Sequence, residues 1–208
     1  MDSALSSSRA ATGSARDRIY LRNPDQQLVK VIVSGPFGVG KTTIVRSLSE
    51  IPPLKTEEVM TATGAVVDHL HGVRDKTTTT VGLDYGRVSL ADDLALCLFG
   101  TPGQQRFHAL WKDLTHGALG ALILADTRRI ADSYEVMGLI EEQGLPYAVA
   151  LNHFPDSPAY PDAELRKALD LAPDTPLITC DARDRGTSLR ALLALAEHLQ
   201  KLPALEHP

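Results

Sequence analysis

One short stretch constrains the fold of this chain more than any other, because residues 35–42 read Gly-Pro-Phe-Gly-Val-Gly-Lys-Thr. They match the pattern G-x-x-x-x-G-K-[ST], in which glycines let consecutive backbone N–H groups face phosphate oxygens. The stretch follows an apolar run, residues 28–33, and precedes a helical pattern that begins near Thr42. This order places a helix N-terminus beside the phosphates. The sequence therefore predicts a nucleoside triphosphate site, in which Lys41 contacts the β and γ phosphates and the Thr42 hydroxyl binds Mg²⁺.

The loop contributes most of the predicted nucleotide contacts. We expect these contacts from Gly35, Phe37, Gly38, Val39, Gly40, Lys41, Thr42 and Thr43.

Short apolar runs alternate with stretches of helical periodicity along the rest of the chain. The runs expected to form strands are residues 28–33, 81–90, 94–99, 118–125, 147–151 and 177–179. The stretches expected to form helices are residues 42–50, 104–116, 132–143, 162–171 and 187–201. Such alternation is typical of βαβ units, and a short turn at residues 92–93 joins an antiparallel pair. The prediction is an α/β fold with one six-stranded, mostly parallel sheet and helices on both faces.

The chain length accommodates one domain with a terminal extension. Residues 1–27 are rich in Ser, Ala and Arg, and we expect them to form a flexible arm that is either inert or used for docking. Residues 28–203 are expected to form the nucleotide-binding domain, and residues 204–208 a short tail. Residues 55–79 are predicted to be a long functional loop.

Composition excludes several classes of protein. The 208 residues include 21 Lys and Arg against 26 Asp and Glu, a net charge of −5, so nucleic acid is not an expected partner. No apolar run approaches the ~20 residues that span a bilayer, so no direct membrane insertion is expected. Cys97 and Cys180 lack metal-ligand spacing and are expected to be buried thiols in a reducing cytosol. We therefore expect a cytoplasmic protein, recruited to a membrane only through partners.

Two further segments resemble the switch regions of the Ras superfamily of small GTPases. Residues 80–85 read Thr-Val-Gly-Leu-Asp-Tyr and residues 100–107 read Gly-Thr-Pro-Gly-Gln-Gln-Arg-Phe. The resemblance implies that Thr80 binds Mg²⁺ when a γ-phosphate is present and that the Gly103 amide contacts this phosphate. It also implies that Gln104 orients the attacking water. Lys41, Thr80 and Gln104 are thus the implied catalytic residues.

The base-reading elements of that superfamily are matched in part. Asn152-His153-Phe154-Pro155 stands where the family has Asn-Lys-x-Asp, and an acidic residue, Asp156, follows one position later. Residues 180–183, Cys-Asp-Ala-Arg, resemble the family's Thr-Ser-Ala-Lys. The strength of a guanine over adenine preference is left open by the displaced carboxylate. The residues that the resemblance assigns to the base are Asn152, Phe154, Asp156, Asp181, Ala182 and Arg183.

Within the superfamily the chain is most similar to the bacterial small GTPases of conservon operons, and more distantly to the polarity GTPase MglA. The resemblance implies a GTP/GDP switch with slow GTP hydrolysis, a roadblock-type regulator and a sensor-kinase-like membrane protein as partners. Two alternatives remain: a degenerate nucleotide-binding scaffold without significant hydrolysis, and a P-loop phosphotransferase.

Two positions depart from the superfamily pattern. Gly100 stands where most members have an Asp that holds Mg²⁺ through a water, so either Thr42, Thr80, phosphates and waters hold the metal alone, or Asp84 substitutes. Weaker Mg²⁺ retention predicts fast spontaneous nucleotide exchange.

The second departure is the bulky Phe37 in the loop, which is expected either to obstruct an arginine supplied by an activator or to pack away. Arg74 or Arg106 is then the expected internal arginine.

Overall fold

The computed structural model describes residues 26–52, 57–59, 78–80, 84–102 and 111–202. Its centre is a six-stranded sheet of order β4-β5-β1-β6-β7-β8, with β4 antiparallel to β5 and the other pairs parallel. These strands are β1 (Gln27–Ser34), β4 (Asp84–Ala91), β5 (Leu94–Gly100), β6 (Gly120–Ala125), β7 (Tyr147–Asn152) and β8 (Leu177–Cys180). The predicted α/β fold with one antiparallel strand is confirmed.

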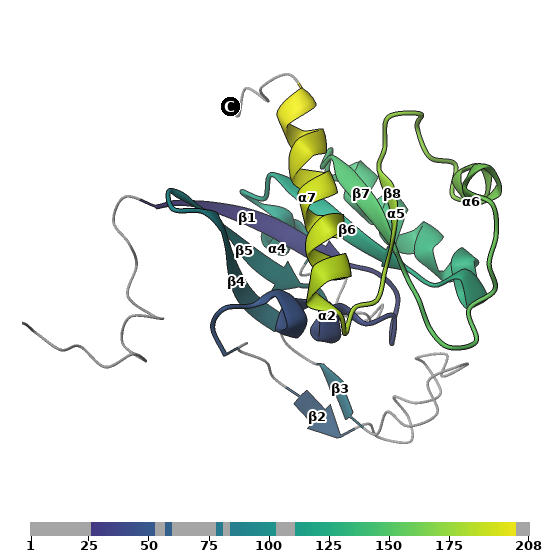
Figure 1. Ribbon diagram of the computed structural model, residues 1–208, viewed down its shortest axis with the longest axis horizontal. Helices are drawn as coiled ribbons and strands as arrows, with labels where there is room; N and C mark the ends of the chain where they lie inside the picture. Colours follow the sequence, from purple (N-terminus) through teal and green to yellow (C-terminus); the bar gives the residue numbers. More distant parts are fainter. Residues whose placement is uncertain (1–25, 53–56, 60–77, 81–83, 103–110, 203–208) are drawn as a thin grey trace, which may run out of the picture.

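Helices cover both faces of this sheet (Figure 1). They are α2 (Lys41–Leu48), α4 (Trp111–Thr115), the 3-10 helix η2 (Thr127–Asp132), α5 (Ser133–Glu142), α6 (Asp162–Ala168) and α7 (Arg185–Lys201). Because side chains alternate along a strand, Val31 and Val33 pack with α2 and α7, whereas Ile32 packs with α5 on the opposite face. Two apolar layers therefore hold the strand ends, and the loops that follow them, in fixed positions.

Several element bounds differ from the sequence prediction. α7 begins at Arg185 rather than at Thr187, because the Asp184 carboxylate caps it by accepting a hydrogen bond from the Thr187 N–H at 2.7 Å. α2 ends at Leu48, where Ser49 turns to an extended conformation. β1 starts at Gln27, within the stretch expected to be the arm.

The segment expected to be a long loop contains regular structure. β2 (Glu57–Val59) and β3 (Thr78–Thr80) form a separate two-stranded antiparallel sheet, in which Glu57 is opposite Thr80. The expectation of a loop was therefore wrong for these residues, since β-branched threonines favour pairing as a strand.

Both cysteines belong to the buried interior of the domain. Cys97 and Cys180 are buried free thiols, as predicted, and burial raises the pKa of Cys180 to about 12. Among the described residues, no helix combines the length and the apolar character that crossing a membrane requires.

Candidate nucleotide-binding site

The phosphate-binding loop, residues 35–42, connects β1 to α2 and lies against the carboxyl ends of neighbouring strands. Gly35 has φ 139°, and a Cβ there would lie 2.4 Å from the Leu124 carbonyl oxygen on β6. Gly40 has φ 110°, and a Cβ there would lie 2.7 Å from the Asn152 Nδ2. Only glycine adopts these angles without strain and allows so close an approach. The predicted loop is therefore present and is packed tightly against the sheet.

The helix that follows begins without a side-chain cap. The residue before α2 is Gly40, which has no side chain to accept a hydrogen bond from the first-turn N–H groups. A helix N-terminus carries a partial positive charge and binds phosphate groups readily. The first turn contains Lys41, Thr42 and Thr43, all three of which the sequence assigned to the nucleotide.

Lys41 is buried inside the loop. Its Nζ donates hydrogen bonds to the carbonyl oxygens of Gly35, at 2.6 Å, and Pro36, at 2.8 Å, and the residue is only 8% exposed. A buried ammonium group is stable only when oxygens surround it, and here the loop's own carbonyls do so. Phosphate oxygens can accept hydrogen bonds from the same ammonium group. Lys41 therefore lies within the predicted phosphate-binding loop, and its contact with phosphate stays a prediction.

The Thr42 hydroxyl contacts a carboxylate. Its Oγ1 donates a 2.6 Å hydrogen bond to Oδ2 of Asp84, the first residue of β4, which is 2% exposed. Mg²⁺ binds hard oxygens and usually takes one or two protein ligands together with phosphates and waters. A hydroxyl and a buried carboxylate beside the phosphate-binding loop fit that requirement.

Asn152 connects three segments of the site. The residue ends β7 and is 5% exposed. Its Nδ2 donates to the Val39 carbonyl oxygen at 2.8 Å, and its Oδ1 accepts from the Ala182 N–H at 2.9 Å. Asn152 thus ties the phosphate-binding loop to the loop after β8, where the sequence placed the base-reading elements.

The loop after β8 is closed by internal hydrogen bonds. The N–H groups of Asp181, Ala182 and Arg183 donate to the Thr187 Oγ1, the Asn152 Oδ1 and the Asp181 Oδ1 respectively. The Arg183 side chain also bonds Asp181 and lowers the pKa of that carboxyl to about 2. For one of these three N–H groups to donate to guanine O6, it would have to give up its present hydrogen bond.

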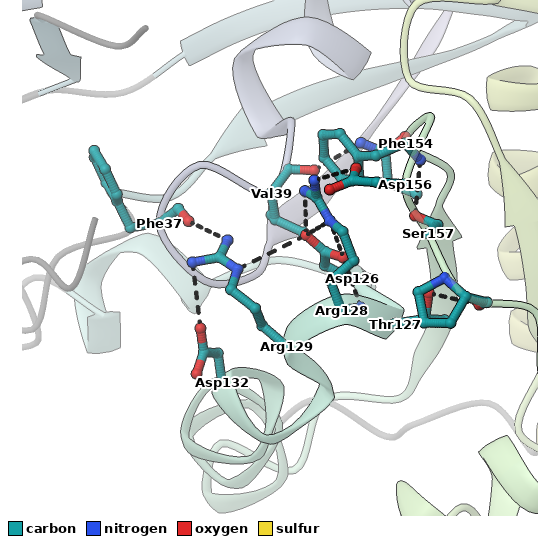
Figure 2. Close-up of polar contacts among 12 residues, drawn as sticks. Phe37, Val39, Asp126, Thr127, Arg128, Arg129, Asp132, Phe154, Asp156 and Ser157 are labelled. Carbon is teal, nitrogen blue, oxygen red and sulfur yellow. Dashed lines mark hydrogen bonds and ion pairs between the residues drawn. The ribbon is translucent and has the colours of Figure 1, made fainter. Parts of the chain in front are cut away.

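Arg128 was not among the predicted site residues, yet it contacts two residues that were predicted to lie near the base, Phe154 and Asp156. Its Nη2 contacts the Asp126 Oδ2 at 2.7 Å and its Nη1 contacts the Asp156 Oδ1 at 2.7 Å (Figure 2). Its guanidinium carbon lies 3.9 Å from the centroid of the Phe154 ring. Hydrogen bonds to the fully buried Asp126 raise the pKa of Arg128. Asp156 and Phe154, both predicted to be near the base, are therefore held by this arginine.

Arg129 extends the same network to the phosphate-binding loop. Its Nη2 donates to the Phe37 carbonyl oxygen at 3.1 Å, and its Nη1 lies 3.4 Å from the Asp132 Oδ2 (Figure 2). Its backbone departs from helical geometry within η2, with φ −147° and ψ 48°. The sequence carries a signal for one member of this network, Asp126, because it directly follows the apolar strand β6 and carboxyl ends of parallel strands meet at one edge of a sheet.

Some predicted residues cannot be placed. Gly103, Gln104, Arg74 and Arg106 lie outside the described residues. Thr80 ends β3, but the position of its side chain is likewise outside the described part.

The phosphate-binding loop joins the central strand β1 to α2 at the carboxyl end of the mostly parallel sheet, and Asn152 is hydrogen-bonded to it. These features define a nucleotide-binding P-loop protein with a G-domain fold. The fold is similar to that of the G-domain of FeoB from Methanococcus jannaschii, with a TM-score of 0.58 and 13% identity over 85% of this chain and 100% of that chain. Residues 33–202 match the family described as conserved hypothetical ATP binding proteins, and the chain belongs to that family. A search of curated proteins found no match.

Proposed function

We propose that this protein is a nucleotide-dependent molecular switch of the small GTPase type. It binds GTP or GDP with Mg²⁺, hydrolyses GTP slowly to GDP and phosphate, and signals through protein partners. The observation that carries the proposal is the buried Lys41, held by the carbonyls of Gly35 and Pro36 at an uncapped helix N-terminus. That arrangement stabilises a triphosphate by charge and by backbone N–H groups.

The residues of this site supply binding and positioning. Lys41 stabilises negative charge that develops on the transferred phosphoryl group, and Thr42 with Asp84 offers oxygen ligands for a cation. Mg²⁺, when bound, neutralises charge on the β and γ phosphates. By resemblance, Gln104 orients the attacking water and Thr80 senses the γ-phosphate.

Single-turnover incubation with GTP tests this function against its two alternatives. The switch releases phosphate from GTP with no acceptor present. A binding scaffold retains nucleotide without releasing phosphate, and a phosphotransferase forms product only when an acceptor is added. Binding of nucleotide without phosphate release would contradict the proposed hydrolysis while leaving nucleotide binding intact.

The base preference is proposed to be for guanine but weak. Pro155 occupies the position of the family's guanine-reading carboxylate, and Asp156 is tied to Arg128. A charged hydrogen bond contributes about 1.5–3 kcal/mol, so its absence from the base edge keeps the GTP over ATP preference below about tenfold.

Pro155→Asp places a carboxylate at the family position, and we expect it to raise the GTP over ATP preference about tenfold or more. The measurement is competition of GTP and ATP against a fluorescent GDP analogue. Asp156→Asn is the matched control and should change the ratio by less than about threefold, since that carboxylate is engaged by Arg128. Loss of all base preference in Asp156→Asn would show that Asp156 reads the base after all.

Partners are also part of the proposal. By resemblance we propose a roadblock-type regulator and a sensor-kinase-like membrane protein that recruits this cytoplasmic protein. The similarity to conservon GTPases and to MglA carries this proposal.

The half-buried Phe37 lies in the phosphate-binding loop, with its carbonyl held by Arg129. We expect Phe37→Gly to change single-turnover GTP hydrolysis about threefold or more, because we propose that the Phe37 ring obstructs the space beside the γ-phosphate. Phosphate release is measured with and without the regulator. Unchanged rates under both conditions would contradict a role of Phe37 in hydrolysis.

A further inference from the structure

Asp84 and Gly100 face one another across the antiparallel pair of β4 and β5. A Cβ built on Gly100 would lie 2.9 Å from the Asp84 Cβ and 3.2 Å from its Oδ2. Real side chains do not approach so closely without a shift, so the Asp84 side chain occupies the space that a residue at position 100 would need. The space between positions 84 and 100 has room for one carboxylate side chain, and in this chain that side chain belongs to Asp84 on β4.

The Asp84 carboxylate is placed where a cation beside the phosphate-binding loop would need it. It is 2% exposed and accepts the Thr42 hydroxyl hydrogen at 2.6 Å. The Thr42 hydroxyl is the donor in this contact, and a hydroxyl oxygen is one of the hard oxygens that Mg²⁺ binds. Burying a carboxylate to this degree costs folding free energy unless the carboxylate is paired or helps to hold a metal.

We propose that Asp84 is the carboxylate that retains Mg²⁺ at this site, taking over from β4 the function that Gly100 cannot perform. The inference rests on the proposed nucleotide-binding function and decides between the two alternatives left open by the sequence. Asp84 and Thr42 would together hold the metal, and the Asp84 carboxylate would supply the negative charge that retains it. The fast nucleotide exchange expected from Gly100 alone then becomes the behaviour of a variant without the Asp84 carboxylate.

The test is the rate at which a fluorescent GDP analogue leaves the full-length protein, measured over a Mg²⁺ titration and in excess EDTA. Asp84→Asn should raise the Mg²⁺ concentration needed for half-maximal slowing at least about tenfold, as expected for the loss of one charged ligand. The rate in EDTA should stay within about twofold of wild type, because metal-free binding depends on the loop.

The second variant moves the carboxylate from β4 to β5. In Asp84→Gly combined with Gly100→Asp, the side chain returns to β5 in the space that Asp84 leaves, and the Mg²⁺ requirement should return to within about threefold of wild type. Asp92→Asn, an exposed residue in the turn of the same hairpin, is the control and should behave as wild type. If Asp84→Asn does not fold, Asp84→Glu tests the same point, because the longer side chain misplaces the carboxylate.

The outcomes separate this inference from the proposed function. If Asp84→Asn or Asp84→Glu keeps the wild-type Mg²⁺ dependence, the inference is overturned, and Thr42, Thr80, phosphates and waters hold the metal alone. If the wild-type protein binds no GDP or GTP even in saturating Mg²⁺, the proposed function itself has failed.

Discussion

We expect Lys41→Met to lower the affinity for GTP and GDP at least about 100-fold, because each charged hydrogen bond to phosphate contributes about 1.5–3 kcal/mol. Methionine preserves most of the aliphatic packing of this residue, which is only 8% exposed. The fold should persist, since the two hydrogen bonds given above for the Lys41 ammonium reach carbonyls of its own loop, those of Gly35 and Pro36. Isothermal titration with GDP measures the loss of affinity, and circular dichroism confirms the fold.

Lys30→Met is the matched control for this experiment. Lys30 lies on β1 and donates to the His116 carbonyl oxygen at 2.8 Å, outside the phosphate-binding loop. Its replacement removes the same charge from the same strand–loop unit but should change GDP affinity by less than about threefold. If Lys41→Met binds GDP as tightly as wild type, phosphate binding by residues 35–42 is contradicted.

The second large effect is expected from Asn152→Asp, which keeps the shape of the side chain but exchanges its donor for an acceptor. The new carboxylate oxygen would face the Val39 carbonyl oxygen that now accepts from Nδ2 at 2.8 Å. Two oxygens in contact at a buried position repel each other, and we expect unfolding free energy to fall by about 3 kcal/mol. For a domain of this size that corresponds to a decrease in Tm of about 6–12 °C.

The pH dependence identifies the cause of that destabilisation. Burial raises the pKa of the new carboxyl in the folded state above its unfolded value. The protonated form can again donate to Val39, so stability is retained at low pH and lost as pH rises through the folded pKa.

Urea unfolding of the nucleotide-free protein should therefore show a smaller deficit at pH 5 than at pH 8. Asn152→Ala, which carries no titrating group, should show a deficit that is the same at both values. A pH-independent deficit in Asn152→Asp would contradict the donor role of the Nδ2 group.

The phosphate-binding loop and the sheet could be predicted from sequence because both depend on local patterns. The spacing of glycines before Lys41 specifies the turn, and apolar runs of strand length specify buried parallel strands. Asn152 was assigned through the resemblance of residues 152–155 to the Asn-Lys-x-Asp element, and its place at the end of β7 agrees with the position of that element after a strand.

The arginine network could not be predicted in the same way. Arg128 and Arg129 follow β6 in a charged stretch that reads as an ordinary solvated turn. Their importance depends on which partners the fold brings near: Asp126 for both, Asp156 for Arg128 and the Phe37 carbonyl for Arg129. These partners come from three different strand–loop units, so no local pattern contains them.

By itself, the sequence determined that this chain forms a mostly parallel α/β sheet with a phosphate-binding loop, because periodicity and glycine placement act over a few residues. Only the tertiary structure decided which residues distant in the sequence complete the site around that loop. Thr42 and Asp84 are 42 positions apart, and Asn152 and Val39 are 113 positions apart. Strand order and the β4–β5 register bring them together, and that register places the Asp84 carboxylate opposite Gly100.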